Sequence, residues 1–536
     1  MWLVVVLGCG SSAPPVERVA GPPAPFEIRV EPAEIEITSG PEGGDRVPFS
    51  AFRVESDGTE TPLDVVTWEL SNLSSGTLTS DGVFRPSTSN GGISWVVASL
   101  DGVEGKGTIT VIHEEDINPA GLDPALFEGN ATSTTGLWAY PSDGVSFPRN
   151  TPSVHFQWFP SSPAGVRLEL ASPLSRTFVY TADASWIADG ELWARISATN
   201  AGGTVSATLR GVNTYGELVE EGPLTLHVNR MDAEGSIIYW STSESGLVEI
   251  PFGGVAQPFL TAAETGHCLG CHVISKGGKI AFTYDGGDGG LGVKQVADGS
   301  DIIPYGSGQA ANFKTFSPDD RFLLATLAGT LTLHDAATGA VLGTVRANSD
   351  VTMPDWSPDD SRLAFAQSDG HTSDVFLSSH TRLSLMDHLG DGAFDAPRTI
   401  YDPPAPSRVC YPSFSPDGNW IVFVISTGDC YDDPDAELWI VDKDGARAPI
   451  RLDALNAGTG LTNSWPRWAP LPDDSVLWIA FSSKRAYGTQ VSGVAQLWAA
   501  AFDPAVAEQG GDGSYAAFWL PGQNLATSNH IPMWVE

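Results

Sequence analysis

The sequence has few cations, few cysteines and no long apolar run. Its 536 residues include 28 Lys and Arg against 65 Asp and Glu, so the formal net charge is −37. Because nucleic-acid binding depends on cationic side chains that neutralise phosphates, this imbalance excludes a nucleic-acid reader. It equally excludes attachment to an anionic membrane surface through basic residues. No segment reaches the roughly 18 consecutive apolar residues of a membrane-spanning helix, so no spanning segment is predicted.

The remaining composition is that of a folded, β-rich protein. Hydrophobic residues make up 41% of the chain and include 17 Trp, enough for a substantial core. Charged residues make up only 17%, below the roughly 25% usual for soluble domains, while 58 Gly and 39 Pro supply many turns. Apolar and polar residues alternate over short segments between turn signals, without a sustained helical period. This pattern predicts an all-β fold.

Residues 1–25 resemble a lipoprotein export signal followed by a tether. Residues 2–8 are apolar, and Val6-Leu7-Gly8-Cys9 is similar to the lipobox of bacterial lipoproteins, in which the cysteine is lipidated. The resemblance implies lipidation at Cys9, export to the cell envelope and membrane attachment through this lipid alone. The apolar run is short and lacks a basic segment before it, which an earlier start codon would supply. The alternative is an apolar start with a chance cysteine.

Two all-β blocks follow, over residues 26–114 and 115–233. In the first, Val66-Thr67-Trp68 and Ser80-Asp81-Gly82-Val83 lie among short alternating segments, and the block resembles bacterial Ig-like domains. The second resembles a fibronectin-III-like sandwich, with strands predicted over segments that include residues 191–200. Neither block gathers His, Cys or carboxylates at metal-ligand spacing, so both are expected to be spacers.

Residues 234–536 contain a repeat in which an aromatic residue precedes Ser-Pro-Asp and then an apolar strand. The copies with a recognisable aromatic start lie at Phe316, Trp356, Phe414 and, in variant form, Trp468. Ser-Pro-Asp suits a tight turn, because Pro fixes φ and Asp hydrogen-bonds its own backbone. Each unit is therefore predicted to be strand, turn and strand. Degenerate copies around Ser275 and at the carboxyl terminus bring the number to six.

These repeats resemble the WD40-like repeats of TolB-type β-propellers, which implies six blades over this block. The terminal half-unit, residues 530–536, is expected to pair with residues 236–240, so that the last strand closes the ring and leaves no open edge. The fold class predicted for the whole chain is all-β: two β-sandwich domains, Ig-like and fibronectin-III-like, followed by a six-bladed β-propeller.

One motif in the propeller block carries chemistry. Cys268-Leu269-Gly270-Cys271-His272 matches C-x-x-C-H, the attachment signature of c-type haem. Two thiols at this spacing reach the two vinyl groups of one porphyrin, and the adjacent imidazole can then bind the iron. His272 also takes a position that Pro holds in other copies of the repeat. We predict covalent haem c on Cys268 and Cys271 with His272 as proximal ligand. A disulfide between the two cysteines and a metal site are the alternatives.

The sequence does not single out a distal iron ligand. His530 begins the terminal half-unit, in the blade beside the haem-bearing copy, and Met353 holds the same repeat position as Cys271. Met533 and His267 are further candidates, and a five-coordinate haem is equally open. Core packing is the alternative role for both methionines.

The remaining cysteines and the acidic loops suggest structural roles. Cys410 and Cys430 flank one strand of a single blade and are predicted to form a disulfide, which would restrain residues 427–433 in an oxidising compartment. Calcium is a second candidate cofactor, at residues 285–290 or at the aspartates of residues 429–435. Acidic runs of this kind are more often solvated turns.

No catalytic residues are predicted, because hydrolase signatures such as Gly-x-Ser-x-Gly and His-Glu-x-x-His are missing. We expect an exported, lipid-anchored envelope protein that carries one haem c for electron transfer or haem-based redox chemistry. Its partner would be a redox protein or another envelope protein. The alternative is a TolB-like scaffold without haem that binds proteins or polysaccharides on an Ig-like stalk. The sequence selects no oligomeric state.

Overall fold

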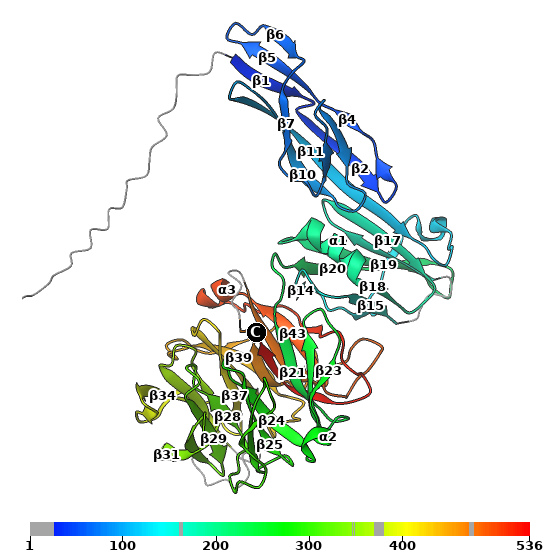
Figure 1. The fold of residues 1–536 in the computed structure, drawn as a ribbon. Coiled ribbons are helices and arrows are strands. Elements are labelled where there is room, and N and C mark those ends of the chain that lie inside the picture. Colours follow the sequence, from blue (N-terminus) through cyan, green and yellow to red (C-terminus); the bar gives the residue numbers. More distant parts are fainter. Residues whose placement is uncertain (1–25, 160–164, 346, 348, 369–379, 471–475) are drawn as a thin grey trace, which may run out of the picture. The chain divides into compact units, whose positions relative to one another are not determined.

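A computed structural model of the chain describes residues 26–159, 165–345, 347, 349–368, 380–470 and 476–536. These residues fold almost wholly into β-strands and form two compact units (Figure 1). The first unit ends at Glu115 and adds Pro173–Ser175, and the second holds the rest of the chain. The predicted fold class is confirmed. In the described part of the chain, no helix is long and apolar enough to cross a membrane.

The first unit is a β-sandwich built from short strands. Its first strand alternates buried and exposed residues, as the sequence pattern requires of a strand with one face on the core. Phe26, Phe84 and Ile109 lie in that core, and Trp68 packs against it while staying partly exposed. The strands are β1 (Phe26–Glu31), β2 (Glu34–Gly40), β3 (Gly43–Gly44), β4 (Val47–Pro48), β5 (Ser50–Glu55), β6 (Glu60–Leu63), β7 (Thr67–Leu70), β8 (Gly76–Leu78), β9 (Val83–Pro86), β10 (Gly92–Leu100) and β11 (Val103–Ile117).

The second unit begins with another β-sandwich. A three-stranded sheet, β13-β15-β18, faces a sheet that contains β12, β20, β19, β16 and β17, with β14 paired to β20. The elements are the 3₁₀ helix η1 (Pro124–Phe127), β12 (Thr132–Ser133), β13 (Trp138–Tyr140), β14 (Val145–Phe147), β15 (Val154–Trp158), β16 (Val166–Ala171), β17 (Ser175–Thr181), β18 (Ser185–Ala188), α1 (Gly190–Asn200), β19 (Thr204–Val212) and β20 (Leu218–Val228).

The strand predicted over residues 191–200 is wrong, because this segment is helix α1. The Asp189 side chain accepts a hydrogen bond from the Leu192 amide at 3.0 Å and so caps the first turn. The segment is rich in Glu, Leu, Ala and Arg, which favour helix. Trp193 and Ile196 on one helix face are buried, and this spacing supplies an apolar stripe toward the sandwich core.

The rest of the second unit is a propeller of six blades, as predicted. Each blade has four main strands, and its inner strand contacts the inner strands of both neighbouring blades. From the inner strand outward, blade 1 is β45 (Asn529–Val535), β21 (Ser236–Ser241), β22 (Gly246–Pro251) and β23 (Gln257–Leu260), with the short helix α2 (Ala262–Thr265) following. Blade 2 is β24 (Leu269–Ile274), β25 (Lys279–Tyr284), β26 (Leu291–Gln295) and β27 (Asp301–Ile303); blade 3 is β28 (Lys314–Phe316), β29 (Phe322–Leu327), β30 (Thr330–Asp335) and β31 (Val341–Val345).

The other three blades follow the same order. Blade 4 is β32 (Asp350–Trp356), β33 (Arg362–Ser368), β34 (Arg382–Gly390) and β36 (Arg398–Tyr401), with β35 (Ala393–Phe394) also on β34; blade 5 is β37 (Arg408–Phe414), β38 (Trp420–Ser426), β39 (Glu437–Asp442) and β40 (Ile450–Arg451). Blade 6 is β41 (Ser464–Trp468), β42 (Leu477–Ser483), β43 (Gln496–Phe502) and β44 (Phe518–Trp519), with helix α3 (Pro504–Glu508) between the last two strands.

The last strand closes the ring on the first blade. β45 pairs antiparallel with β21, which places Val535 opposite Ser236 and Asn529 opposite Ser241. The predicted pairing of the terminal half-unit is therefore confirmed. Because β45 also contacts β24 and β41, the inner strands form a complete circle around one axis.

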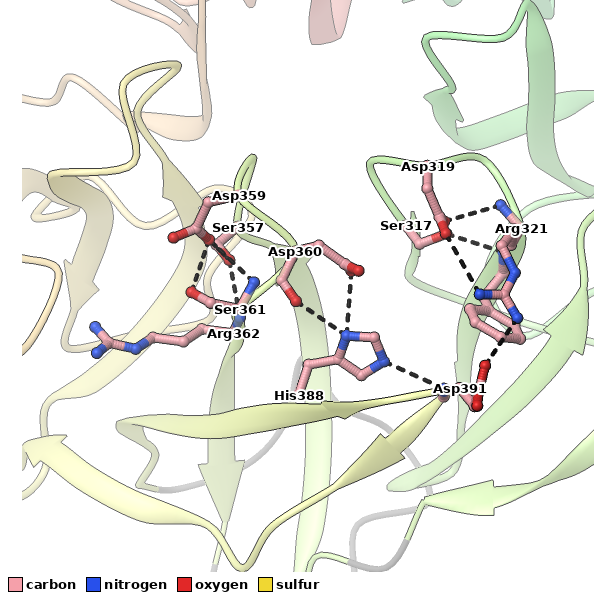
Figure 2. Close-up of polar contacts among 12 residues, drawn as sticks. Ser317, Asp319, Arg321, Ser357, Asp359, Asp360, Ser361, Arg362, His388 and Asp391 are labelled. Atoms are coloured by element: carbon pink, nitrogen blue, oxygen red, sulfur yellow. Dashed lines mark hydrogen bonds and ion pairs between the residues drawn. The ribbon is translucent and has the colours of Figure 1, made fainter. Parts of the chain in front are cut away.

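In blades 3, 4 and 5, a Ser-Pro-Asp turn connects the inner strand to the second strand of the blade. In blades 3 and 4 the hydroxyls of Ser317 and Ser357 donate to the carboxylates of Asp319 and Asp359 (Figure 2). Each serine hydroxyl also accepts the backbone N–H five residues later at 2.9 Å, and Ser415 does the same for Trp420. The repeated motif thus fixes the hairpin that aims each inner strand at the axis.

We predict that Ser415→Ala lowers the free energy of unfolding by about 1–3 kcal/mol, because it leaves the buried Trp420 N–H without its acceptor. Ser492→Ala, at an exposed serine between β42 and β43, is the control and should change stability by less than about 0.5 kcal/mol. Chemical denaturation of both variants measures the difference. Equal stability of the two variants would contradict the role of the turn.

Candidate functional site

The inner strands share a distortion at one repeat position. The position lies four residues before the first residue of the turn. There the pairing register between the inner strand and the second strand of the blade breaks in five of the six blades. At that position φ lies between 42° and 56°, a left-handed region that non-glycine residues normally avoid. The six equivalent residues, which we call the plug ring, are Cys271, Phe313, Met353, Tyr411, Trp465 and Ile531. The distortion marks the axis as a candidate site.

The plug ring closes the axis between two cavities. The Tyr411 and Trp465 rings stack with centroids 4.3 Å apart, and Phe313 lies 5.3 Å from Trp465. The space left among these side chains is about 10 Å³, room for roughly one water molecule. On one side lies a cavity of about 310 Å³. On the other, a cavity of about 200 Å³, the funnel, is bordered by the Ser-Pro turns.

The larger cavity contains one thiol of the C-x-x-C-H motif, and we call it the thiol pocket. It is lined by Trp240, Gly270, Cys271, Gly286, Gly287, Asp429, Tyr431, Trp465 and Ile531. Most of these walls are aromatic or aliphatic, and the volume lies at the lower end of ordinary ligand pockets, roughly 300–1,000 Å³. The pocket combines an apolar wall with one carboxylate and one thiol.

Both thiols of the motif are free and neutral. Neither Cys268 nor Cys271 is joined to another cysteine, and both are partly exposed. Burial raises the pKa of each thiol. The Cys268 thiol lies beside the Trp240 indole, which forms a wall of the thiol pocket. Cys271 therefore lines the thiol pocket, and Cys268 lies beside one of its walls.

Lys314 supports Cys271 from the neighbouring blade. Its ammonium is buried and donates to the Cys271 carbonyl, to Thr283 Oγ1 at 2.7 Å and to the Asn312 carbonyl at 2.6 Å. All three protons of the ammonium are thereby used. Burial lowers the pKa of Lys314 to about 8. Lys314 thus anchors the backbone at the distorted position of β24.

His272 does not face the thiol pocket. Its ring is buried against blade 1, where Nε2 lies 3.2 Å from the Ile238 carbonyl and donates to it. Nδ1 has no hydrogen-bond partner in the described part of the chain. Burial lowers the pKa of His272 to about 3, so the imidazole is neutral. The predicted proximal ligand therefore links two blades in this structure.

The predicted distal ligands lie in four different places. His530 is buried and does not line the thiol pocket itself: its ring stacks on the wall residue Tyr431 with centroids 5.1 Å apart, and Nε2 lies 3.3 Å from Tyr431 Oη. Met353 belongs to the plug ring, and its sulfur accepts the Tyr411 amide at 3.2 Å. Met533 lines the funnel, on the other side of the plug ring. His267 pairs with Asp285 at 3.2 Å and stacks on Tyr305.

A disulfide joins Cys410 on β37 to Cys430, in the loop after β38. The same loop carries Tyr431 and Asp429 into the thiol pocket. Within the loop, the Asp433 carboxylate accepts from Ser426 and from several backbone amides. No group of three or more His, Cys, Asp or Glu side chains among the described residues is arranged to hold a metal ion. Calcium stays a prediction, and Cys9 lies outside the described residues.

Sequence reasoning missed three walls of the thiol pocket. Trp465 and Ile531 hold the same repeat position as Cys271, so an alignment of the six copies would have placed them around it. Tyr431 comes from a loop outside the repeat unit, and no sequence signal marks it. The polar residues on the funnel side of the ring, described below, follow from the same alignment.

Comparison with known proteins gives similarity of fold. No family model matches the chain, and no curated protein matches it. Among solved structures, TolB from Acinetobacter baumannii is 14% identical with a TM-score of 0.39 and covers 78% of this chain and 95% of its own. A TolB homologue from Agrobacterium tumefaciens is 15% identical, TM-score 0.33, and covers 56% and 90%. Hydrazine synthase from Kuenenia stuttgartiensis is 14% identical, TM-score 0.33, and covers 48% and 70%.

The buried neutral His272 predicts a pH dependence of stability. Because its pKa falls from 6.5 in the unfolded chain to about 3, the stability it contributes is present above pH 6.5 and is lost as the pH falls. We expect His272→Gln, which can still donate to Ile238, to lose about 2 kcal/mol less than the wild type between pH 7 and pH 5. Urea denaturation at both pH values measures this. Parallel losses in the two proteins would contradict a neutral, buried His272.

Proposed function

We propose that the chain is an exported propeller protein whose thiol pocket holds one haem c, bound covalently through Cys268 and Cys271, for electron transfer or haem-based redox chemistry. The observation that carries the proposal is the position of the motif. Cys271 occupies the plug ring on the axis and lines the apolar thiol pocket. A chance pentapeptide in a strand has no reason to coincide with the axis and a pocket.

The thiols fit the attachment of haem. Neither is in a disulfide, Cys271 lines the pocket and Cys268 lies beside Trp240 in its wall, so an S–H group is present at each position to add across a vinyl group. The other two described cysteines are joined to each other and cannot compete. When bound, haem would supply an iron that gains and loses one electron.

His272 does not fit the proximal position, because its Nε2 is engaged with the Ile238 carbonyl of blade 1 and its ring does not line the thiol pocket. His530 suits an iron ligand better. It comes from blade 1 and contacts two residues of the pocket wall, Trp240 and Tyr431, and its buried Nδ1 has no partner in the described part of the chain. Burial lowers its pKa to about 4, so the ring is neutral and able to bind a metal.

The protein residues around the pocket would control access and charge. Trp465 and Ile531 exclude water from the inner wall, since both are almost fully buried in the plug ring. Asp429 places a carboxylate at the mouth, in a chain whose net charge is −37. A cationic redox partner would therefore be attracted and a polyanion repelled.

Export and lipid anchoring at Cys9 belong to the same proposal. C-type haem is attached outside the cytoplasm, and the Cys410–Cys430 disulfide is of the kind that persists in an oxidising compartment. The Ig-like and fibronectin-III-like sandwiches would then hold the propeller away from the membrane as spacers. The partner would be a redox protein or another envelope protein.

A scaffold without haem is the second candidate, and the orientation of His272 favours it. In that case the C-x-x-C-H cysteines would have no cofactor, and the propeller would bind proteins or polysaccharides. The hydrogen bond from His272 to blade 1 would then be purely structural.

We predict that protein made in cells competent for cytochrome c maturation keeps a haem signal after denaturation, and that Cys268→Ala/Cys271→Ala loses it completely. The reason is that only thioether bonds survive unfolding. Peroxidase staining of a denaturing gel and the visible spectrum of the denatured protein measure the attached haem.

Met353→Leu is the matched control, because it changes the same repeat position in another blade and should keep the haem signal. A wild-type protein without stain under these conditions would contradict the haem proposal. It would leave the scaffold function as the better account.

A further inference from the structure

The funnel has a floor built from one repeat position. This position lies two residues before the first residue of each turn. Every inner strand contributes one side chain there, and all six side chains line the funnel. We call them the floor ring: Val273, Thr315, Asp355, Ser413, Arg467 and Met533. Two of these residues are aliphatic or a thioether, two carry hydroxyls, one is a carboxylate and one is a guanidinium. A six-fold scaffold therefore has an asymmetric floor.

In two blades the floor position supplies a hydrogen-bond acceptor to the next blade. Thr315 Oγ1 accepts the backbone N–H of Trp356 at 3.2 Å, and Asp355 Oδ2 accepts that of Phe414 at 2.7 Å. Both bonds join the inner strands of neighbouring blades. The position therefore has a structural task that a hydroxyl or a carboxylate can perform.

Arg467 cannot perform that task, because a guanidinium has no acceptor atom. It forms no hydrogen bond within the described residues, and its Nη1 is buried. Its single polar contact is with Asp355 Oδ1 at 3.8 Å, which is too long for a hydrogen bond. Buried guanidinium donors are costly to leave unpaired. The Arg467 guanidinium lies at the floor of a cavity that opens to solvent.

The funnel suits a small ligand with negative charge. Its volume of about 200 Å³ is below that of pockets for drug-sized molecules. Proline rings from the turns, such as Pro318 and Pro358, form the walls. Lys276 stands at the rim, and no described ionisable side chain other than Lys276, Asp355 and Arg467 lines the cavity. The walls thus combine proline and aromatic rings with the serines of three turns, and the two largely buried charged groups, Asp355 and Arg467, lie on the floor.

We propose that the funnel is a carboxylate-binding site in which the Arg467 guanidinium, which has an ion pair with Asp355 but no hydrogen bond among the described residues, anchors the ligand. The planar fork of a guanidinium matches the two oxygens of a carboxylate. A small organic acid and the carboxyl terminus of a short peptide present the same group, and the volume admits either a whole acid or a terminal residue. The site is separated from the thiol pocket by the plug ring and does not depend on haem.

Asp355 makes binding at this site depend on pH. Burial raises its pKa to about 6, although Arg467 opposes the shift. An ionised Asp355 repels an incoming carboxylate, and a protonated one does not. Arg467 from β41 and Lys276 from the turn after β24 are the charged groups that face it across the funnel, with the Ser413 hydroxyl on β37. Binding therefore favours the protonated form of Asp355, and affinity is expected to rise as the pH falls from 8 to 6.

Calorimetric titration of the full chain with acetate, and with N-acetyl-trialanine bearing a free or an amidated carboxyl terminus, tests the site. We expect saturable binding of acetate, of the free-carboxyl peptide or of both, and none of the amidated peptide. The two arms distinguish a free acid from a peptide terminus.

Arg467→Met should abolish binding of the carboxylate, and Arg467→Lys should keep binding but weaken it by at least about tenfold. Asp355→Asn should bind about tenfold more tightly at pH 7 and lose the pH dependence.

Arg398→Met, on the outer strand β36, is the control and should bind like the wild type. Thermal unfolding shows whether each variant folds, and Arg467→Lys keeps the test valid if Arg467→Met does not. Unchanged affinity in a folded Arg467 variant, or no saturable binding of either carboxylate by the wild type, overturns the proposal. Neither result affects the haem test, because that test measures haem attached at the thiol pocket and not binding in the funnel.

Discussion

The pairing of β45 with β21 is the constraint on which the rest of the propeller depends. It covers the edge that blade 1 would otherwise expose and forces six inner strands into a closed circle. Once the circle is closed, residues at one repeat position must meet at one axis. The plug ring follows from this geometry, and its left-handed backbone is tolerated because neighbouring blades hold it on both sides.

Function in this fold is located where a copy departs from the repeat. Serine, proline and aspartate at the turns do the same work in several blades and carry little chemistry of their own. Cys271 and Arg467 replace residues that pack or accept hydrogen bonds in sister copies. One departure puts a thiol on an apolar pocket, and the other puts a guanidinium whose buried Nη1 has no hydrogen bond among the described residues on the floor of the funnel. The plug ring keeps the two chemistries apart.

Much of the fold could be predicted because the repeat encodes it locally. An aromatic, Ser-Pro-Asp and an apolar strand specify a hairpin, and six copies specify a ring that the terminal half-unit must close. Helix α1 was missed because its apolar residues also fit alternation, and the Asp189 cap decided the outcome. The orientation of His272 could not be predicted either. A break in register beside Cys271 sends the imidazole to blade 1, and no motif records such a break.

The intact mass of the exported protein under denaturing conditions tests the central claim most directly. The account predicts a mass raised by one covalently attached haem, located by digestion to the peptide that contains Cys268 and Cys271. A mass without that addition, lower by the two hydrogens of a second disulfide or unchanged at these residues, would contradict it.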